Sequence, residues 1–180
     1  SYSGLWGGPY LMHVYRLDKG DAGSVLAMMA LGMIAGSFLL GWLARNIFRG
    51  RKPLILLCGA ISLLITAAFT LWIDRLSLPL LYLLTFGIGL ANNAVVVIGF
   101  TMAKELFPVR MAGTATGLVN FFPFASGALL QPVLGLVLEK AGRVGTVFHT
   151  VGYRRMFLVL TGCALGALVA AFFLRETGKR

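Results

Sequence analysis

The sequence predicts an all-α protein, a polytopic bundle of transmembrane helices. Of its 180 residues, 58% are hydrophobic and only 12% are charged, and the mean hydropathy is +0.87. A soluble domain of this length needs a larger polar surface, so the composition indicates a membrane protein. Charged residues also divide the chain into long charge-free runs, most of which reach the roughly 20 apolar residues that a helix needs to cross a bilayer.

The charge-free runs predict six helices in succession. Backbone polar groups inside a bilayer must be satisfied within a helix or a closed barrel, and the runs lack the alternating pattern of barrel strands. The expected helices cover about residues 1–15, 22–46, 53–73, 77–103, 111–138 and 155–174. The first is shorter than a membrane crossing and starts at residue 1, so we expect a helix that is truncated in this chain.

Proline and small residues support several of these helices individually. Pro53 and Pro79 stand where the third and fourth helices begin, a place where the missing N–H of proline is tolerated. Small residues at four-residue spacing predict close contacts between helices. They form three patterns: Gly32 with Gly36; Cys58 with Ser62, Thr66 and Thr70; and Gly162 with Gly166. The longest connection, 139–155, is amphipathic, and we expect it at a surface.

Lysine and arginine gather in the connections between helices. The net charge is +10, but the cations form no amphipathic face with interleaved aromatic residues, which argues against nucleic-acid binding. Cations near helix ends favour the cytoplasmic side of a membrane. The segments 45–53, 104–110 and 175–180 fall on one side and carry more cations than the other side. We therefore expect the 45–53 loop and the C-terminus in the cytoplasm.

The basic loop in GWLARNIFRGRKPL (41–54) carries a recognisable motif. It resembles the loop signature of the major facilitator superfamily, which joins the second and third helices of each half. The position in this chain is the same, between the second and third predicted helices. The residues that correspond to the motif are Gly41, Arg45, Gly50, Arg51 and Lys52. Arg45 stands where the family has an acid, and the resemblance assigns that acid to a charge–dipole latch between neighbouring helices.

Two further segments are similar to the C-terminal half of the same family. KELFPVRMAGTATG (104–117) looks like the connection between the fourth and fifth helices of a half, and LRETGK (174–179) like the end of the twelfth helix. By this resemblance, residues 1–180 form one domain, helices seven to twelve of a twelve-helix fold.

The resemblance also implies a function and a location. It implies a multi-pass secondary transporter of the cell membrane that moves a small solute by alternating access. The expected partners are that small-molecule substrate, the lipid bilayer and an N-terminal six-helix half, without which the chain is expected to be inactive. No cofactor is expected.

Polar and aromatic side chains within the helices are the predicted substrate-binding residues. Transporter halves bind substrate near the middle of the bilayer, at the interface between repeats, and an amide in hydrocarbon needs a partner in protein, ligand or water. The predicted binding residues are Trp6, Tyr10, Asn92, Asn93, Asn120 and Gln131. Packing between helices, or anchoring at the membrane surface for the aromatic residues, remains the alternative for each.

Two other functions compete with transport. One is a membrane sensor or scaffold that uses the same fold without transporting, since a fold does not fix function. The other is an intramembrane hydrolase, which needs a nucleophile and a base at matched depth. Ser126 lacks a glycine two residues before it, and His149 lies in a loop. We therefore expect no enzyme, with neither catalytic residues nor a metal site.

Overall fold

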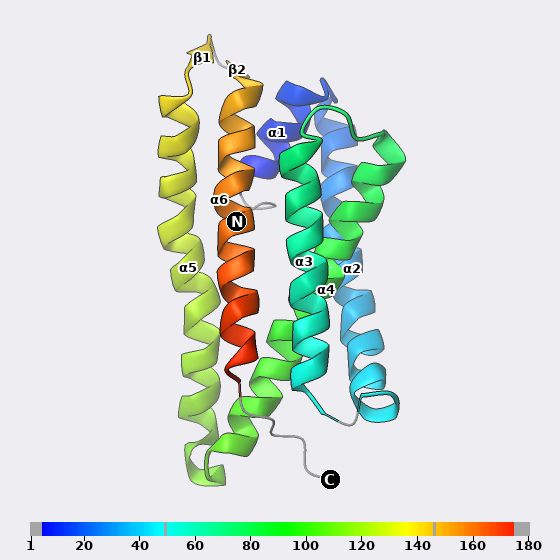
Figure 1. Ribbon diagram of the computed structural model, residues 1–180, viewed down its shortest axis with the longest axis vertical. Helices are drawn as coiled ribbons and strands as arrows, with labels where there is room; N and C mark the ends of the chain where they lie inside the picture. The colour runs from blue at the N-terminus through cyan, green and yellow to red at the C-terminus, as the bar shows by residue number, and fades with distance from the viewer. Residues whose placement is uncertain (1–4, 49, 146, 175–180) are drawn as a thin grey trace.

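The computed structural model describes residues 5–48, 50–145 and 147–174, without the side chains of Arg45, Ala94, Val95 and Val144. These residues form a bundle of long, roughly parallel and antiparallel helices (Figure 1). The helices are α1 (Gly7–Val14), α2 (Lys19–Asn46), α3 (Lys52–Leu71), α4 (Leu78–Leu106), α5 (Ala112–Lys140) and α6 (Thr150–Phe172), with a short 3-10 helix, η2 (Val109–Met111), before α5.

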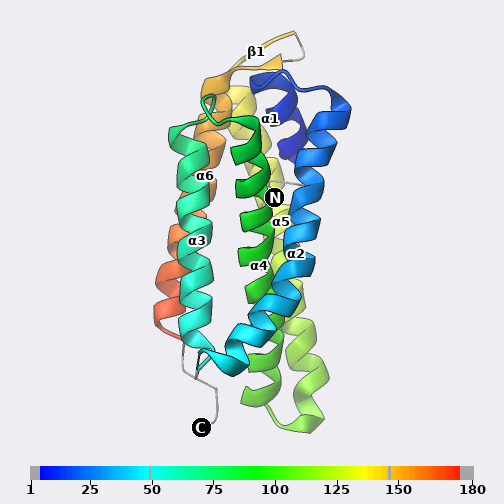
Figure 2. The same cartoon turned by 90° about the vertical axis from the view of Figure 1, so that its right-hand side faces the viewer.

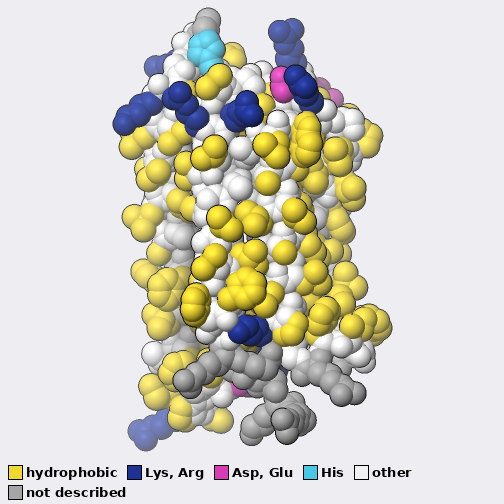
Figure 3. All heavy atoms as spheres, viewed as in Figure 1, with side chains coloured by type: hydrophobic (Ala, Val, Ile, Leu, Met, Phe, Trp, Pro, Cys, Tyr) yellow, Lys and Arg dark blue, Asp and Glu magenta, His cyan; other side chains and the backbone are white. Residues whose placement is uncertain are grey.

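Five of the helices in the described part of the chain, α2 to α6, are long and apolar enough to cross a membrane. They run alternately up and down the bundle (Figures 1 and 2). Hydrophobic side chains cover the middle of the face seen in Figure 3, whereas lysine and arginine gather toward its ends. The predicted helical membrane fold is therefore confirmed.

Several helices extend further than the sequence predicted. α2 begins at Lys19 because Asp18 caps it: Oδ1 of Asp18 accepts a hydrogen bond from the backbone N–H of Asp21 (2.6 Å). α6 begins at Thr150, and α4 continues to Leu106. The expected boundaries stopped at charged residues, but long charged side chains are tolerated in terminal turns because they reach the membrane surface.

A two-stranded hairpin joins α5 to α6, where the sequence predicted only a surface segment. Strands β1 (Arg143–Val144) and β2 (Val147–Phe148) pair antiparallel, with Arg143 opposite Phe148. Gly145 has φ 61°, a left-handed conformation that glycine adopts without steric cost. The Gly-Thr pair between two valines is a hairpin signal that was available in the sequence.

The closest helix–helix contact joins α2 and α4. A Cβ added to Gly32 would lie 2.1 Å from the carbonyl oxygen of Phe86, and one added to Gly89 would lie 2.1 Å from that of Met29. A Cβ added to Gly36 would lie 2.9 Å from the carbonyl oxygen of Leu90. The packing predicted for Gly32 and Gly36 is confirmed. These helices touch backbone to backbone, which glycine permits because it has no side chain.

The other two small-residue patterns have different outcomes. Cys58 is buried, and Thr70 on α3 bonds Thr161 on α6 through their hydroxyls (3.0 Å), so this pattern packs as predicted. Gly162 and Gly166 have nothing within 4 Å of an added Cβ. The prediction that they pack against a neighbouring helix is wrong within the described chain, because they lie on the outward side of α6.

These glycines allow a controlled test of the α2–α4 contact. We expect Gly32→Ala to destabilise the protein by about 3 kcal/mol, the upper end for overpacking, because the new methyl group meets rigid backbone. Gly162→Ala is the control and should be neutral or slightly stabilising, since alanine favours helix and the space is open. Thermal unfolding in detergent measures both. Equal melting curves for the two variants would contradict the backbone contact.

Candidate functional site

A buried amide connects α2 and α4 next to their glycine contact. Asn93 on α4 is 5% exposed. Its Nδ2 donates to the carbonyl oxygen of Met33 (2.8 Å) and to the hydroxyl of Ser37 (2.7 Å), both on α2. Ser37 itself donates to the carbonyl of Met33 (3.0 Å). Asn93 thus makes interhelical hydrogen bonds, as expected if its role is packing between helices. Substrate binding by Asn93 stays a prediction.

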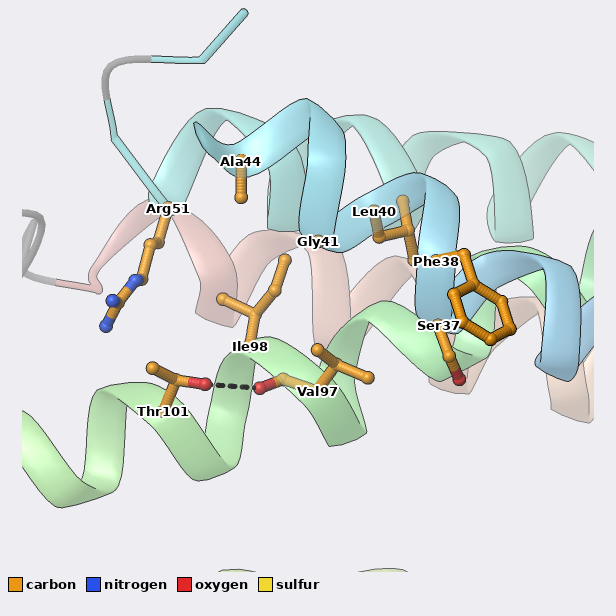
Figure 4. A pocket seen from close by; sticks show the side chains of 9 residues that line it. All are labelled: Ser37, Phe38, Leu40, Gly41, Ala44, Arg51, Val97, Ile98 and Thr101. Carbon is orange, nitrogen blue, oxygen red and sulfur yellow. Dashed lines mark hydrogen bonds between the residues drawn. The ribbon is translucent and has the colours of Figure 1, made fainter. Parts of the chain in front are cut away.

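A pocket of about 430 Å³ lies beside this network, between α2 and α4 (Figure 4). Its lining residues are Ser37, Phe38, Leu40, Gly41, Ala44, Arg51, Val97, Ile98 and Thr101. Figure 4 shows Arg51 at one end, and Ser37 with Phe38 at the other. The Thr101 hydroxyl donates to the carbonyl of Val97 (2.7 Å). A mostly apolar wall with a few hydroxyls and one cation suits a small polar solute.

The predicted loop motif lies at the same end of the bundle. Gly41 and Arg51 line the pocket, and Gly50 directly precedes the turn into α3. Arg51 forms an ion pair with Glu105, in the last turn of α4. Arg45 stands where the family has an acid, and its side chain is not among those that the structure describes.

Lys52, the last motif residue, contacts the end of another helix. Its Nζ donates to the carbonyl oxygen of Phe172 at 2.6 Å, where α6 ends. The last carbonyl groups of a helix lack intrahelical donors and carry partial negative charge, so a cation there is stabilising. Together Arg51 and Lys52 fasten the start of α3 to the ends of α4 and α6. This charge–dipole contact uses a cation of the loop rather than an acid at the position of Arg45.

Trp6 and Gln131 come together at another place, between α1 and α5. The indole Nε1 of Trp6 donates to the backbone carbonyl of Gln131 (3.2 Å). The Trp6 ring also lies 3.0 Å from the place where a Cβ on Gly135 would be. Both predicted residues are half-buried. The structure therefore brings these two predicted binding residues into one contact, through the backbone of Gln131.

Tyr10 lies in the core rather than on an open face. It is fully buried, and its hydroxyl donates to the carbonyl oxygen of Ile73 (2.8 Å), just past the end of α3. The ring packs edge-on against Phe157, with centroids 4.9 Å apart. Tyr15 lies nearby, and burial raises the pKa of its hydroxyl above the ordinary value. Tyr10 thus holds α1 against α3 and α6, and substrate contact by Tyr10 stays a prediction.

The two remaining amides, Asn92 and Asn120, are both exposed. Oδ1 of Asn92 accepts a hydrogen bond from the hydroxyl of Ser62 on α3 (3.1 Å), so it faces away from α2. Asn120 stands on α5, among exposed apolar residues such as Phe121 and Phe124. The predicted binding residues are therefore distributed over several places, and only Trp6 and Gln131 meet directly among the described contacts.

Two residues of this region were missed by the sequence analysis. Ser37 accepts from Asn93 and lines the pocket, and Glu105 pairs with Arg51. Ser37 follows Gly36 directly, so a small polar residue beside a packing glycine was a usable signal. Glu105 belongs to the segment 104–117, which was recognised, but the sequence of that segment does not predict an ion pair with Arg51.

Comparison with known proteins identifies the family. A family model described as Major Facilitator Superfamily matches residues 2–180. The chain belongs to the major facilitator superfamily. A solved structure of a superfamily member, the proton:xylose symporter XylE, superposes with a TM-score of 0.74 and 18% identity, covering 93% of this chain and 39% of that one. This likeness confirms the fold.

Two curated relatives of this major facilitator chain are transporters. It is 27% identical to a probable hexose phosphate transport protein of Chlamydia trachomatis serovar D, over 91% of this chain and 34% of the relative. It is 25% identical to the glycerol-3-phosphate transporter of Bacillus subtilis strain 168, over 97% and 37%. The chain thus spans about a third of the length of these relatives.

The roles of two asparagines can be separated by stability measurements. We expect Asn93→Ala to destabilise the protein by about 1 kcal/mol, because the Ser37 hydroxyl loses a buried donor. Asn120→Ala, the control, should change stability by less than about 0.5 kcal/mol, since its side chain is exposed. Thermal or urea unfolding in detergent provides the comparison. A larger loss for Asn120→Ala would show that the assignment of the packing residue is wrong.

Proposed function

We propose that the chain is the C-terminal six-helix half of a twelve-helix secondary transporter, which moves a small solute across the cell membrane by alternating access. The loop motif after α2 supports the assignment to a half of the fold, and the segments 104–117 and 174–179 support the C-terminal one. The relatives support it too, since each is about three times as long as the chain. The proposed orientation keeps the 45–53 loop and the C-terminus in the cytoplasm, following the distribution of cations.

The exposure of α5 is the observation that carries this proposal. Of its residues, Ala115, Leu134 and Leu138 are buried. Contact between the exposed amide of Asn120 and lipid is unfavourable, because an unpaired amide in hydrocarbon costs several kcal/mol. A second helical bundle, with a hydrated pathway between the halves, would cover α5 and give Asn120 partners.

The pathway wall would be formed by one face of α5. Asn120 and Gln131 lie eleven residues apart, about three helical turns, and so project on the same side. Trp6 adds an aromatic surface beside Gln131. These groups offer hydrogen bonds and stacking without charge, which suits the hydroxyl groups of a sugar or polyol. Tyr10, Asn92 and Asn93 stay predicted contributors.

The substrate class that we propose is a small hydroxylated organic solute, with phosphorylated sugars and polyols first. The two curated relatives are named for hexose phosphate and glycerol 3-phosphate, and XylE is named for xylose. The stretches 22–44, 54–73, 76–103, 111–138 and 156–174 contain no charged residue. A phosphate group would therefore be bound by the proposed other half, while this half would bind the hydroxyl groups.

Transport by the complete polypeptide tests the proposal. We expect the full-length protein in proteoliposomes to accumulate glucose 6-phosphate, glycerol 3-phosphate or xylose with saturable kinetics. The 180-residue chain alone should give none, because it lacks the other wall of the pathway. Saturable uptake by the isolated chain would overturn the assignment as a half. Specific binding of these solutes without uptake by the full-length protein would instead support the sensor function.

Variants of α5 test the site within the same assay. Asn120→Ala and Gln131→Ala should each raise KM roughly tenfold, the effect of losing one or two hydrogen bonds to substrate. Ser126→Ala is the matched control, because Ser126 is exposed on a different face of α5 and bonds its own helix at the carbonyl of Pro123 (2.9 Å). Unchanged KM in both amide variants would remove α5 from the binding site.

A further inference from the structure

A second groove lies between α3 and α4, at the end of the bundle opposite the basic loop. It has a volume of about 330 Å³ and is lined by Ala68, Trp72, Arg75, Leu76, Leu80 and Leu84. Both views show α3 and α4 side by side at this end, where a short loop joins them (Figures 1 and 2). The groove is distant from the pocket beside Asn93, and the proposed function makes no use of it.

The groove has an apolar floor and a polar rim. Ala68 lies in the last turn of α3, which ends just before Trp72, and Leu80 lies one turn before Leu84 on α4. The apolar lining therefore follows both helices for about one turn, roughly 5 Å. Trp72 is 53% exposed. Tryptophan at the end of a membrane helix lies at headgroup depth, with its N–H toward water. The floor therefore faces hydrocarbon while the rim faces the membrane surface.

Arg75 supplies a cation at this rim. It is exposed, and the described hydrogen bonds give it a single backbone contact, N–H to the carbonyl of Trp72 (3.2 Å), with no ion pair for its guanidinium among the described residues. The neighbouring acid, Asp74, does not line the groove and lies near Tyr15 instead. The Arg75 guanidinium is thus available to a ligand, and guanidinium binds phosphate well.

Cations outnumber acids at this end of the bundle, although acidic side chains lie among them. Figure 3 shows lysine and arginine side chains in a row at this end of the bundle, above the hydrophobic face. Arg154 and Arg155 are exposed in the first turns of α6. α6 packs along α3, where the Phe69 and Phe157 rings stack 5.1 Å apart. The rim therefore lies on a surface with an excess of cations, and this excess favours anionic lipid headgroups.

We propose that this groove binds one anionic phospholipid of the adjacent leaflet. The phosphate contacts the Arg75 guanidinium, the Trp72 indole N–H donates to the headgroup or ester oxygens, and the upper part of an acyl chain occupies the floor. Such a chain continues into the roughly 15 Å of hydrocarbon in one leaflet. An anionic headgroup is favoured over a zwitterionic one, because the negative charge of its phosphate is not offset by a positive amine in the same headgroup.

Lipid titration of the full-length protein tests this site. Native mass spectrometry in detergent would count bound dioleoylphosphatidylglycerol and dioleoylphosphatidylcholine on the wild type, Arg75→Gln and Lys19→Gln. We expect the wild type to bind phosphatidylglycerol more tightly. Arg75→Gln should weaken that binding roughly fivefold, the effect of about one surface cation. Lys19→Gln is the control, an exposed cation outside the groove lining, and should bind as the wild type does.

A second variant separates the acyl slot from the cationic rim. Leu84→Trp fills the floor and should weaken phosphatidylglycerol binding while leaving Arg75 in place. Glycerophosphoglycerol, the same headgroup without acyl chains, should not compete. Competition by this free headgroup would show an anion site and overturn the lipid assignment. Equal binding of both lipids to the wild type, or equal loss in Arg75→Gln and Lys19→Gln, would also overturn it.

Discussion

The backbone contact between α2 and α4 is the constraint on which the arrangement of this bundle depends. In a bilayer, helices gain little from hiding apolar side chains, so close approach and interhelical hydrogen bonds decide which helices associate. Gly32 and Gly89 bring each helix against a carbonyl group of the other, and Asn93 closes the contact with two hydrogen bonds. This pair forms both sides of the pocket, and α4 gives α3 a surface to pack against.

Charge organises the ends of the bundle in a complementary way. The cations of the 45–53 loop lie close to the ends of α4 and α6, where Arg51 pairs with Glu105 and Lys52 binds the carbonyl of Phe172. The exposed ion pair adds little free energy by itself. The ion pair and the Lys52 hydrogen bond instead fix positions, because they connect the start of α3 to the ends of α4 and α6. With the glycine contact, these bonds connect α2, α3, α4 and α6 at this end of the bundle.

Much of the fold could be predicted from the sequence because the bilayer imposes strict rules. Charge-free runs of about 20 residues must become helices, and Gly32 and Gly36 marked a true contact face. Outward-facing Gly162 and Gly166 have the same spacing, so spacing alone does not reveal which face meets a neighbour. The exact helix ends, such as Lys19 after the Asp18 cap, depended on local hydrogen bonds. The β1–β2 hairpin depended on a glycine turn that the helical pattern concealed.

The candidate site was less predictable than the fold. The sequence identified amides that need hydrogen-bond partners. It does not reveal whether a neighbouring helix or a substrate supplies them, because either partner offsets the cost of burying the amide. The structure gives Asn93 partners on α2 and Asn92 a partner on α3, whereas Asn120 is exposed on α5. Tyr10 was expected on a pathway and lies in an aromatic core, where its hydroxyl donates to the carbonyl of Ile73 just past the end of α3. Such long-range partners are set by tertiary packing, which periodicity does not encode.

The most direct test measures whether the α2–α4 pair stays fixed during the proposed transport. Spin labels at Leu31→Cys and Leu83→Cys, exposed on α2 and α4, would report their separation in the full-length protein by pulsed electron resonance. A third label at Phe124→Cys, on the exposed side of α5, would report water accessibility. We expect substrate to leave the Leu31–Leu83 distance unchanged and to change the accessibility at Phe124. A substrate-dependent change in the Leu31–Leu83 distance would contradict the fixed contact between α2 and α4.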